Sequence, residues 1–450
     1  MSIPFALLAA LENVKGFNRS SFEEVHASGE QITSIRVNPA KKANVLFSLI
    51  RGTIPWCPQG HYLSQRPSFT LDPLLHAGAY YVQEASSMFL SHVLKEMIGQ
   101  DTHKKVLDLC AAPGGKSTLL ASYFSEGLVV CNEVIKSRAS VLIENISKWG
   151  SDNVIVTNND PSHFQSLAGY FDVIVIDAPC SGSGLFRKDP DSILEWSEEN
   201  VLHCSQRQQR ILADTLPTLK ENGLLIYSTC SYSPEENEAI ADWLIAEMQM
   251  KSRRITLPEE WGIVETISTK HHGYGYRFYP DQVKGEGFYI AVFQKGTNSD
   301  SSRLQEQKLT LPSPKEVDMM NSFLPLPDNF FLFKQAEAIR TIQKKWFKDL
   351  QLLAKHLYIR KAGIEIATIK GKDVIPSHEL SVSVLPNCDF RQIALTEEQA
   401  LGYLRRKDIL IEDASLGWAL VTFGGLPLGW VKVLPNRINN YYPVAWRILK

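Results

Sequence analysis

Short hydrophobic runs alternate with longer amphipathic stretches between residues 104 and 248. The runs are too short for helices and are rich in Val, Ile and Leu, as in strands that are buried on both faces. The pattern therefore predicts an α/β fold, with helices on both faces of a mainly parallel sheet. The predicted strands are 106–110, 128–131, 154–157, 173–176 and 224–227, and two later runs, near 263 and at 288–293, extend the sheet.

The regions on either side of this alternation have a different character. Residues 1–98 combine amphipathic helices with one extended run at 33–38 (TSIRVN), which predicts a small α+β lobe. Residues 298–316 are polar with two prolines and predict a linker. Helical periodicity follows at 339–357, whereas 380–450 has short β-like runs separated by glycines. We therefore predict the domains 1–98, 99–297, 317–379 and 380–450, with the linker at 298–316.

Composition narrows the class of protein. The chain has 450 residues, 44% of them hydrophobic and 21% charged, which describes a globular protein with several cores. No apolar run approaches the roughly 18 residues of a membrane-spanning helix, and the first residues lack the basic start of a signal peptide. Seven scattered cysteines without a CxxC pair argue against a metal site. These features predict a cytoplasmic protein that contacts neither membrane nor metal.

The stretch 171–188 (FDVIVIDAPCSGSGLFRK) concentrates reactive side chains where a predicted strand ends. Asp177 closes the strand, and Pro179, Cys180 and Gly182 follow at once. An open α/β sheet places its functional groups at the carboxyl ends of its strands. Taken alone, the stretch is equally consistent with an acid and a thiol that only cap a strand.

A second stretch, LDLCAAPGGK at 107–116, turns from the first strand into a helix through small residues. Gly114 and Gly115 allow a ligand to approach the backbone closely. The stretch lacks the first glycine of a Walker phosphate loop, which argues against phosphate binding. Acids at the ends of three successive strands, Glu133, Asp160 and Asp177, favour a nucleoside-bearing cofactor, since a carboxylate can accept both ribose hydroxyls.

A second thiol, Cys230, lies just past the fifth strand in LIYSTCSY. Because adjacent strands end at the same rim, we expect Cys180 and Cys230 to face one cleft beside Lys116 and Asp177. A cation and a helix starting at Pro234 are expected to lower the thiol pKa values. The alternative is that both are buried structural cysteines, which is how most cysteines behave.

Three motifs together, LDLCAAPGGK, DAPCSGSGLFRKDP and YSTCSYSPEENE, resemble those of the NOL1/NOP2/Sun RNA (cytosine-5)-methyltransferases, in the same order. This resemblance covers residues 70–295 and implies a Rossmann-like core that uses S-adenosylmethionine. The closing GWVK and NYYPVAWRI resemble the PUA-like domain of the bacterial RsmF branch, which methylates small-subunit ribosomal RNA.

The resemblance also implies roles for individual residues. Cys230 would be the nucleophile that adds to carbon 6 of cytosine, and Cys180 would help to remove the proton from carbon 5. Asp177 would hold ring nitrogen 3, with Lys116 beside the reacting groups. Contacts to the cofactor are implied for Cys110, Ala111, Ala112, Pro113, Gly114, Gly115, Lys116, Glu133, Arg138, Asp160 and Asp177.

The expected partner is RNA, most directly 16S ribosomal RNA, either naked or in the small ribosomal subunit. The closing segment interleaves Trp430, Tyr441, Tyr442 and Trp446 with Lys432, Arg437, Arg447 and Lys450. Such interleaving suits RNA, although aromatic residues in a small β domain are as often core. The net charge of −2 indicates no overall basic field. A transfer-RNA methyltransferase and a non-catalytic ribosome-assembly factor remain as alternatives.

Overall fold

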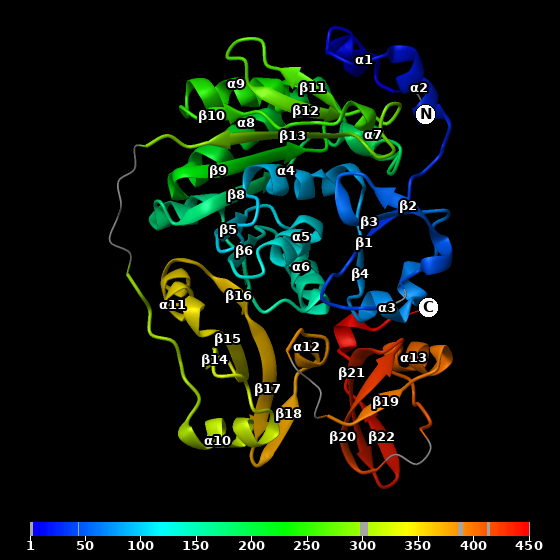
Figure 1. Ribbon diagram of the computed structural model, residues 1–450, viewed down its shortest axis with the longest axis vertical. Helices are drawn as coiled ribbons and strands as arrows, with labels where there is room; N and C mark the ends of the chain where they lie inside the picture. Colours follow the sequence, from blue (N-terminus) through cyan, green and yellow to red (C-terminus); the bar gives the residue numbers. More distant parts are fainter. Residues whose placement is uncertain (1–2, 44, 298–304, 386–389, 412–414, 450) are drawn as a thin grey trace.

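A computed structural model describes residues 3–43, 45–297, 305–385, 390–411 and 415–449. Residues 298–304 of the predicted linker and Lys450 of the predicted RNA-binding segment lie outside the described residues. Figure 1 shows the arrangement: a large central sheet, an N-terminal lobe beside it, and two smaller C-terminal units below.

The central sheet follows the order β11-β12-β13-β9-β8-β5-β6-β7-β16, and β10 pairs with β13. The strands from β9 to β7 are parallel, while β13 and β16 run antiparallel to their neighbours. This arrangement confirms the predicted α/β class. The strands are β5 (Lys105–Asp108), β6 (Leu128–Asn132), β7 (Val154–Thr157), β8 (Phe171–Asp177), β9 (Leu219–Thr229), β10 (Lys251–Arg253), β11 (Val264–Ile267), β12 (Tyr274–Phe278), β13 (Phe288–Gln294) and β16 (Ile359–Ala362).

Successive residues of the middle strands belong to two different cores, one on each face of the sheet. Val106 packs with one cluster and Leu107 with the other, as strand geometry requires. The first face is covered by α4 (Leu90–Met97), α5 (Gly115–Tyr123) and α6 (Lys136–Trp149). The second is covered by α8 (Glu198–Thr215), α9 (Glu238–Ala246) and α11 (Phe347–His356), and the short α7 (Ser192–Glu195) precedes α8.

The N-terminal lobe is built on a four-stranded sheet of order β2-β3-β1-β4. The extended run predicted at 33–38 is confirmed as β1, but the strands β2 and β3 were not predicted, because their glycine- and proline-containing sequences lack a clear alternation. The elements are α1 (Phe5–Leu11), α2 (Arg19–Ala27), β1 (Ser34–Val37), β2 (Ile50–Ile54), β3 (Cys57–Leu63), α3 (Pro73–His76) and β4 (Tyr80–Val82).

The first C-terminal unit differs from its prediction in two respects. The helix predicted over 339–357 is wrong in its first part: residues 338–343 are strand β15, and α11 begins at Phe347. Both faces of β15 are buried, so its sequence has no strand-like alternation. In addition, β16 pairs with β7 and so extends the central sheet. The remaining elements are α10 (Pro314–Phe323), β14 (Phe330–Gln335), β15 (Ala338–Gln343), β17 (Ile364–Lys370), β18 (Asp373–Pro376) and α12 (His378–Ser381).

The last unit is a small β domain of order β19-β20-β21-β22. Trp430 and Tyr442 are completely buried, so these two aromatic residues serve as core, whereas Tyr441 and Trp446 are partly buried. The elements are β19 (Gln392–Ala394), α13 (Glu397–Leu404), β20 (Gly417–Phe423), β21 (Leu426–Leu434) and β22 (Arg437–Asn440). Within the described ranges, no helix in the chain is long and apolar enough to cross a membrane.

Candidate active site

A cavity of about 330 Å³ opens where the parallel strands end. It brings together nine of the residues that the sequence singled out, from four separate parts of the chain: Cys110, Ala111, Ala112, Pro113, Gly115, Lys116, Arg138, Asp177 and Cys230. The remaining four, Gly114, Cys180, Glu133 and Asp160, are not part of its lining.

The two thiols lie side by side at the ends of β8 and β9. The sulfur atoms of Cys180 and Cys230 are 2.9 Å apart, at hydrogen-bonding distance. Backbone hydrogen bonds join their loops, from Ala178 N to the oxygen of Ser228 and from Gly184 N to the oxygen of Cys230, each 2.8 Å long. Both cysteines are free thiols. The expected common position is therefore observed, although only Cys230 lines the cavity.

The predicted lowering of the thiol pKa values is wrong for Cys180. The hydrogen bond with Cys230 and burial raise the pKa of the Cys180 thiol well above its usual range, and the nearby Glu236 carboxylate adds to the shift. The helix expected from Pro234 is also absent at that point, because residues 234–236 form a 3-10 turn and α9 begins at Glu238. The raised pKa favours the protonated form of Cys180, which can then donate across the 2.9 Å contact to the Cys230 sulfur.

An ion pair stands at the edge of the cavity. The Lys116 ammonium, in the first turn of α5, lies 2.7 Å from a carboxylate oxygen of Asp177. The Ser228 hydroxyl donates a 2.8 Å hydrogen bond to the other oxygen. Asp177 is therefore fixed on two sides and keeps its carboxylate at the cavity wall.

The loop between β5 and α5 is held in place by the N-terminal lobe. Gly114 is the N-cap of α5 and has a φ of +116°, a conformation that favours glycine. Arg36 of β1 reaches across and donates to the Gly115 oxygen (3.1 Å) and to the Thr118 hydroxyl (2.5 Å). Its Nε donates to Gln83, which itself lines the cavity. Sequence reasoning missed Arg36, because nothing in TSIRVN points to the distant glycine turn.

The strand-end acids occupy different environments. Glu133 is buried and accepts a hydrogen bond from the backbone of Ile135, while Arg138 contacts the Ala112 oxygen at 2.8 Å. Asp160 instead caps the turn that follows it, accepting from Ser162, and its pKa is lowered by those hydrogen bonds. Neither Glu133 nor Asp160 lines the cavity, so their roles toward a cofactor remain predictions.

Asp108, at the end of β5, is a site residue that the sequence analysis overlooked. It is fully buried and lines the cavity. One oxygen accepts a 2.6 Å hydrogen bond from Ser117, but the other has no partner within the described structure. Burial raises the pKa of this carboxyl to about 7. Glu133, Asp160 and Asp177 were identified because each lies where a strand ends. The same signal could have identified Asp108.

Comparisons with known proteins show which family the chain resembles. The chain matches the family described as 16S rRNA methyltransferase RsmB/F over residues 96–294, the N-terminal domain of RsmF over 3–85 and the RsmF PUA domain over 390–448. Among solved structures, a methyltransferase homolog from Pyrococcus horikoshii is 27% identical with a TM-score of 0.51, and the match covers 65% of this chain and 100% of that one. NSun6 from the same organism, with SFG, has a TM-score of 0.54 at 19% identity, covering 66% and 99%.

Fold and site together define a Rossmann-like methyltransferase. Curated relatives match nearly the full length. "Ribosomal RNA small subunit methyltransferase F" of Aliivibrio fischeri is 30% identical over 98% of this chain and 97% of its own, and the protein of that name from Shewanella oneidensis is 30% identical over 91% and 90%. The chain belongs to the RsmF family of 16S rRNA methyltransferases.

Proposed function

We propose that the enzyme methylates carbon 5 of a cytosine in 16S ribosomal RNA of the small subunit, with S-adenosylmethionine as the methyl donor. The observation that carries this proposal is the thiol pair, Cys230 on the cavity wall and Cys180 2.9 Å behind it, beside the Asp177–Lys116 ion pair. The family membership and the names of the relatives support ribosomal RNA over transfer RNA.

The residues of the cavity suit this cofactor. The partnerless oxygen of Asp108 is a buried acceptor on the cavity wall, which fits the ammonium group of the methionine part. Glu133 is linked to the glycine turn through Arg138, and its carboxylate is suited to the ribose hydroxyls. When bound, S-adenosylmethionine supplies an electrophilic methyl group. The glycine turn, Arg138 and Lys116 would hold it in place.

The chain's own residues divide the chemistry among them. Cytosine carbon 5 is a weak nucleophile, and addition of the Cys230 sulfur to carbon 6 activates it. Negative charge then builds on the ring, and the Lys116 ammonium of the Asp177–Lys116 pair stands ready to stabilise it at nitrogen 3. The hydrogen bond with Cys230, which raises the pKa of Cys180 most, is weakened once the Cys230 sulfur is bonded to carbon 6. Cys180 can then lose its proton to water and, after methylation, removes the proton from carbon 5. The bond between carbon 6 and sulfur then breaks, which restores the aromatic ring and frees Cys230.

Radiolabelled transfer tests the proposal. The protein is incubated with tritiated S-adenosylmethionine and, separately, naked 16S rRNA, intact small subunits and bulk tRNA, and the labelled RNA is digested to nucleosides. We expect label in 5-methylcytidine from rRNA or subunits. Label only in tRNA would overturn the substrate, and label in another nucleoside would overturn the chemistry.

We expect Asp108→Asn to weaken S-adenosylmethionine binding by roughly 10- to 100-fold, because a hydrogen bond to a charged group contributes about 1.5–3 kcal/mol. The affinity of the wild-type protein for S-adenosylmethionine should rise as the pH increases through about 7. Asp108 ionises in that range, and the ionised carboxylate attracts the ammonium group. The variant should lose this rise. Calorimetric titration of the cofactor at several pH values measures both effects, and equal pH profiles for the two proteins would remove Asp108 from the site.

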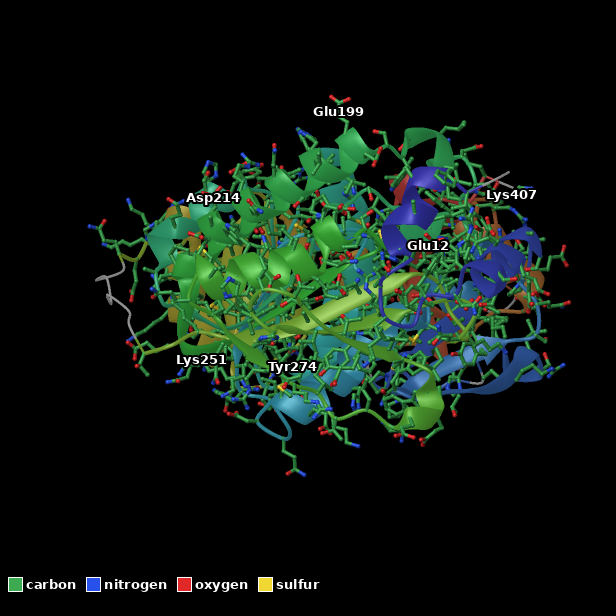
Figure 2. All side chains as sticks on the ribbon, turned by 90° about the horizontal axis from the view of Figure 1, so that it is seen from above. Glu12, Glu199, Asp214, Lys251, Tyr274 and Lys407 are labelled. Carbon is green, nitrogen blue, oxygen red and sulfur yellow. The ribbon has the colours of Figure 1, made fainter. Side chains whose placement is uncertain are left out.

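Basic residues of the last domain are expected to hold the RNA. Lys407 and Arg447 are exposed and line one hollow in its surface. The double variant Lys407→Glu, Arg447→Glu should bind rRNA more weakly and bind the cofactor normally. Because each substitution removes roughly one phosphate contact, the rRNA affinity of the variant should also fall less steeply as the salt concentration rises. Lys251→Glu, at the opposite side of the molecule in Figure 2, is the matched control. Filter binding across salt concentrations measures the slopes. Equal slopes for both variants would contradict this role.

A further inference from the structure

A single buried carboxylate lies beneath the two cysteine loops. Glu236 ends the turn after β9, in the segment YSPEENE, and its exposed fraction is 0%. It forms no ion pair with any residue that the structure describes. A buried charge without a countercharge is costly unless hydrogen bonds satisfy it, so its surroundings identify its role.

Hydrogen bonds to this carboxylate come from both catalytic loops. One oxygen accepts from the Ser181 backbone (2.8 Å) and from Gln208 (3.1 Å). The other accepts from the hydroxyls of Ser181 (2.5 Å) and Ser231 (2.6 Å). Ser181 directly follows Cys180, and Ser231 directly follows Cys230. One side chain therefore ties together the residues that follow the two thiols.

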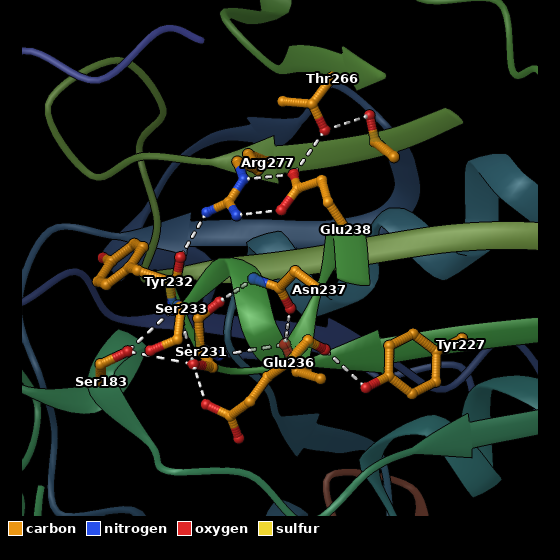
Figure 3. A network of polar contacts seen from close by, with 12 residues as sticks. Ser183, Tyr227, Ser231, Tyr232, Ser233, Glu236, Asn237, Glu238, Thr266 and Arg277 are labelled. Atoms are coloured by element: carbon orange, nitrogen blue, oxygen red, sulfur yellow. Dashed lines mark hydrogen bonds and ion pairs between the residues drawn. The ribbon is translucent and has the colours of Figure 1, made fainter. Parts of the chain in front are cut away.

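Further hydrogen bonds fix the turn that carries Glu236, and Figure 3 shows this network. The Tyr227 hydroxyl, from β9, donates to the backbone oxygen of Glu236 at 2.7 Å. Asn237 donates to the Ser231 oxygen at 2.8 Å and accepts from Thr229 at 2.6 Å. These bonds anchor the turn to β9, the strand that Cys230 directly follows. Glu236 therefore links the two cysteine loops from a fixed position.

We propose that Glu236 is the positioning residue that holds Cys180 and Cys230 at their working separation, and that its negative charge keeps the shared proton on Cys180. The inference rests on the proposed function, since it assigns the two thiols different tasks. Glu236 does not line the cavity and so acts only through the cysteine loops.

The charge of Glu236 and the short distance between the two sulfur atoms both favour a protonated Cys180. Glu236 is among the groups that raise the pKa of the Cys180 thiol, after the hydrogen bond with Cys230 and burial. A protonated Cys180 can donate toward the Cys230 sulfur, and Cys230 is the thiol that lines the cavity and can reach a substrate there.

The hydrogen-bond pattern suits a carboxylate at this position. All the partners of its two oxygens are donors. Glu236→Gln keeps the size, removes the charge and turns its amide NH₂ toward the hydroxyls of Ser181 and Ser231, which must then accept instead of donate. Glu236→Asp keeps the charge but is one methylene shorter. The control is Glu235→Gln, which removes a charge from the same turn, at a partly exposed residue.

Kinetics give the first test. For Glu236→Gln we expect kcat for RNA methylation to fall about 100-fold, the loss typical of reacting groups displaced by about 1 Å. The KM for RNA and cofactor binding should stay at wild-type values. Glu236→Asp should recover part of kcat, and Glu235→Gln should match the wild type. Equal kcat in Glu236→Gln and Glu235→Gln would overturn the proposal, as would a joint loss of kcat and cofactor binding.

Alkylation of the protein without RNA or cofactor gives the second test. Iodoacetamide labelling is followed across pH, and mass spectrometry of peptides reports Cys180 and Cys230 separately. The Cys180 profile should move to lower pH in Glu236→Gln and stay near the wild type in Glu236→Asp. Unchanged profiles in Glu236→Gln would contradict the charge effect. If wild-type protein methylates no cytosine, the proposed function fails, while this alkylation result still decides the role of Glu236.

Discussion

Cys230→Ala is expected to abolish methyl transfer to RNA, with a loss of about 10⁶-fold, the scale seen when an enzyme loses its nucleophile. Of the two adjacent thiols, Cys230 alone lines the cavity. The pKa of its neighbour Cys180 is raised, and Cys180 is not part of the cavity lining. Because addition to carbon 6 precedes every later step, no residue left in the variant can replace the missing sulfur. Steady-state transfer of labelled methyl groups to rRNA measures the loss.

The variant should still bind S-adenosylmethionine with unchanged affinity, since the glycine turn, Asp108 and Arg138 are intact. Cys204→Ala is the matched control, because Cys204 is buried in α8 and is not part of the cavity lining. We expect the control to methylate normally. Full activity in Cys230→Ala would reverse the assignment of the two thiols.

Cys180→Ala is expected to accumulate a covalent complex between protein and RNA. Cys230 can still add to carbon 6 and the methyl group can still be transferred, but the proton on carbon 5 then has no base to remove it, so the carbon–sulfur bond cannot break. Multiple turnover should fall by about 10²- to 10⁴-fold, the usual contribution of a general base. A band of reduced mobility on a denaturing gel, dependent on S-adenosylmethionine, measures the complex.

The double variant Cys180→Ala, Cys230→Ala controls for trapping by another thiol and should give no band. Ordinary turnover by Cys180→Ala without any complex would show that a different group removes the proton.

The fold follows closely from the hydrophobic pattern because the parallel strands are buried on both faces. Runs such as 173–176 have no polar position to obscure them, and each meets helices on both sides. The same reasoning failed at 339–343, where β15 is buried on both faces and is followed closely by helix α11. The combined hydrophobic pattern of strand and helix resembles that of one long helix. It also missed β16, since pairing with β7 depends on how a later unit docks.

The candidate site was accessible to sequence reasoning wherever the residues lie on strand ends or in glycine turns. Lys116, Asp177, Cys180 and Cys230 share one rim for that reason. The roles of Arg36 and Glu236 could not be predicted from the sequence. Their contacts form only after the N-terminal lobe and the two cysteine loops have packed. The raised pKa of Cys180 likewise depends on its hydrogen bond with Cys230 and on burial, which no local sequence signal reports.

The central claim is that the Cys230 sulfur bonds to carbon 6 of the target cytosine, and trapping with the unmodified enzyme tests it most directly. RNA that contains 5-fluorocytosine has no removable proton on carbon 5, so the adduct persists with both cysteines present. Digestion with nuclease and trypsin, followed by mass spectrometry, identifies the cysteine that carries the nucleotide. We predict a methylated, fluorinated cytidine nucleotide on Cys230, and the same nucleotide on Cys180 would contradict the account.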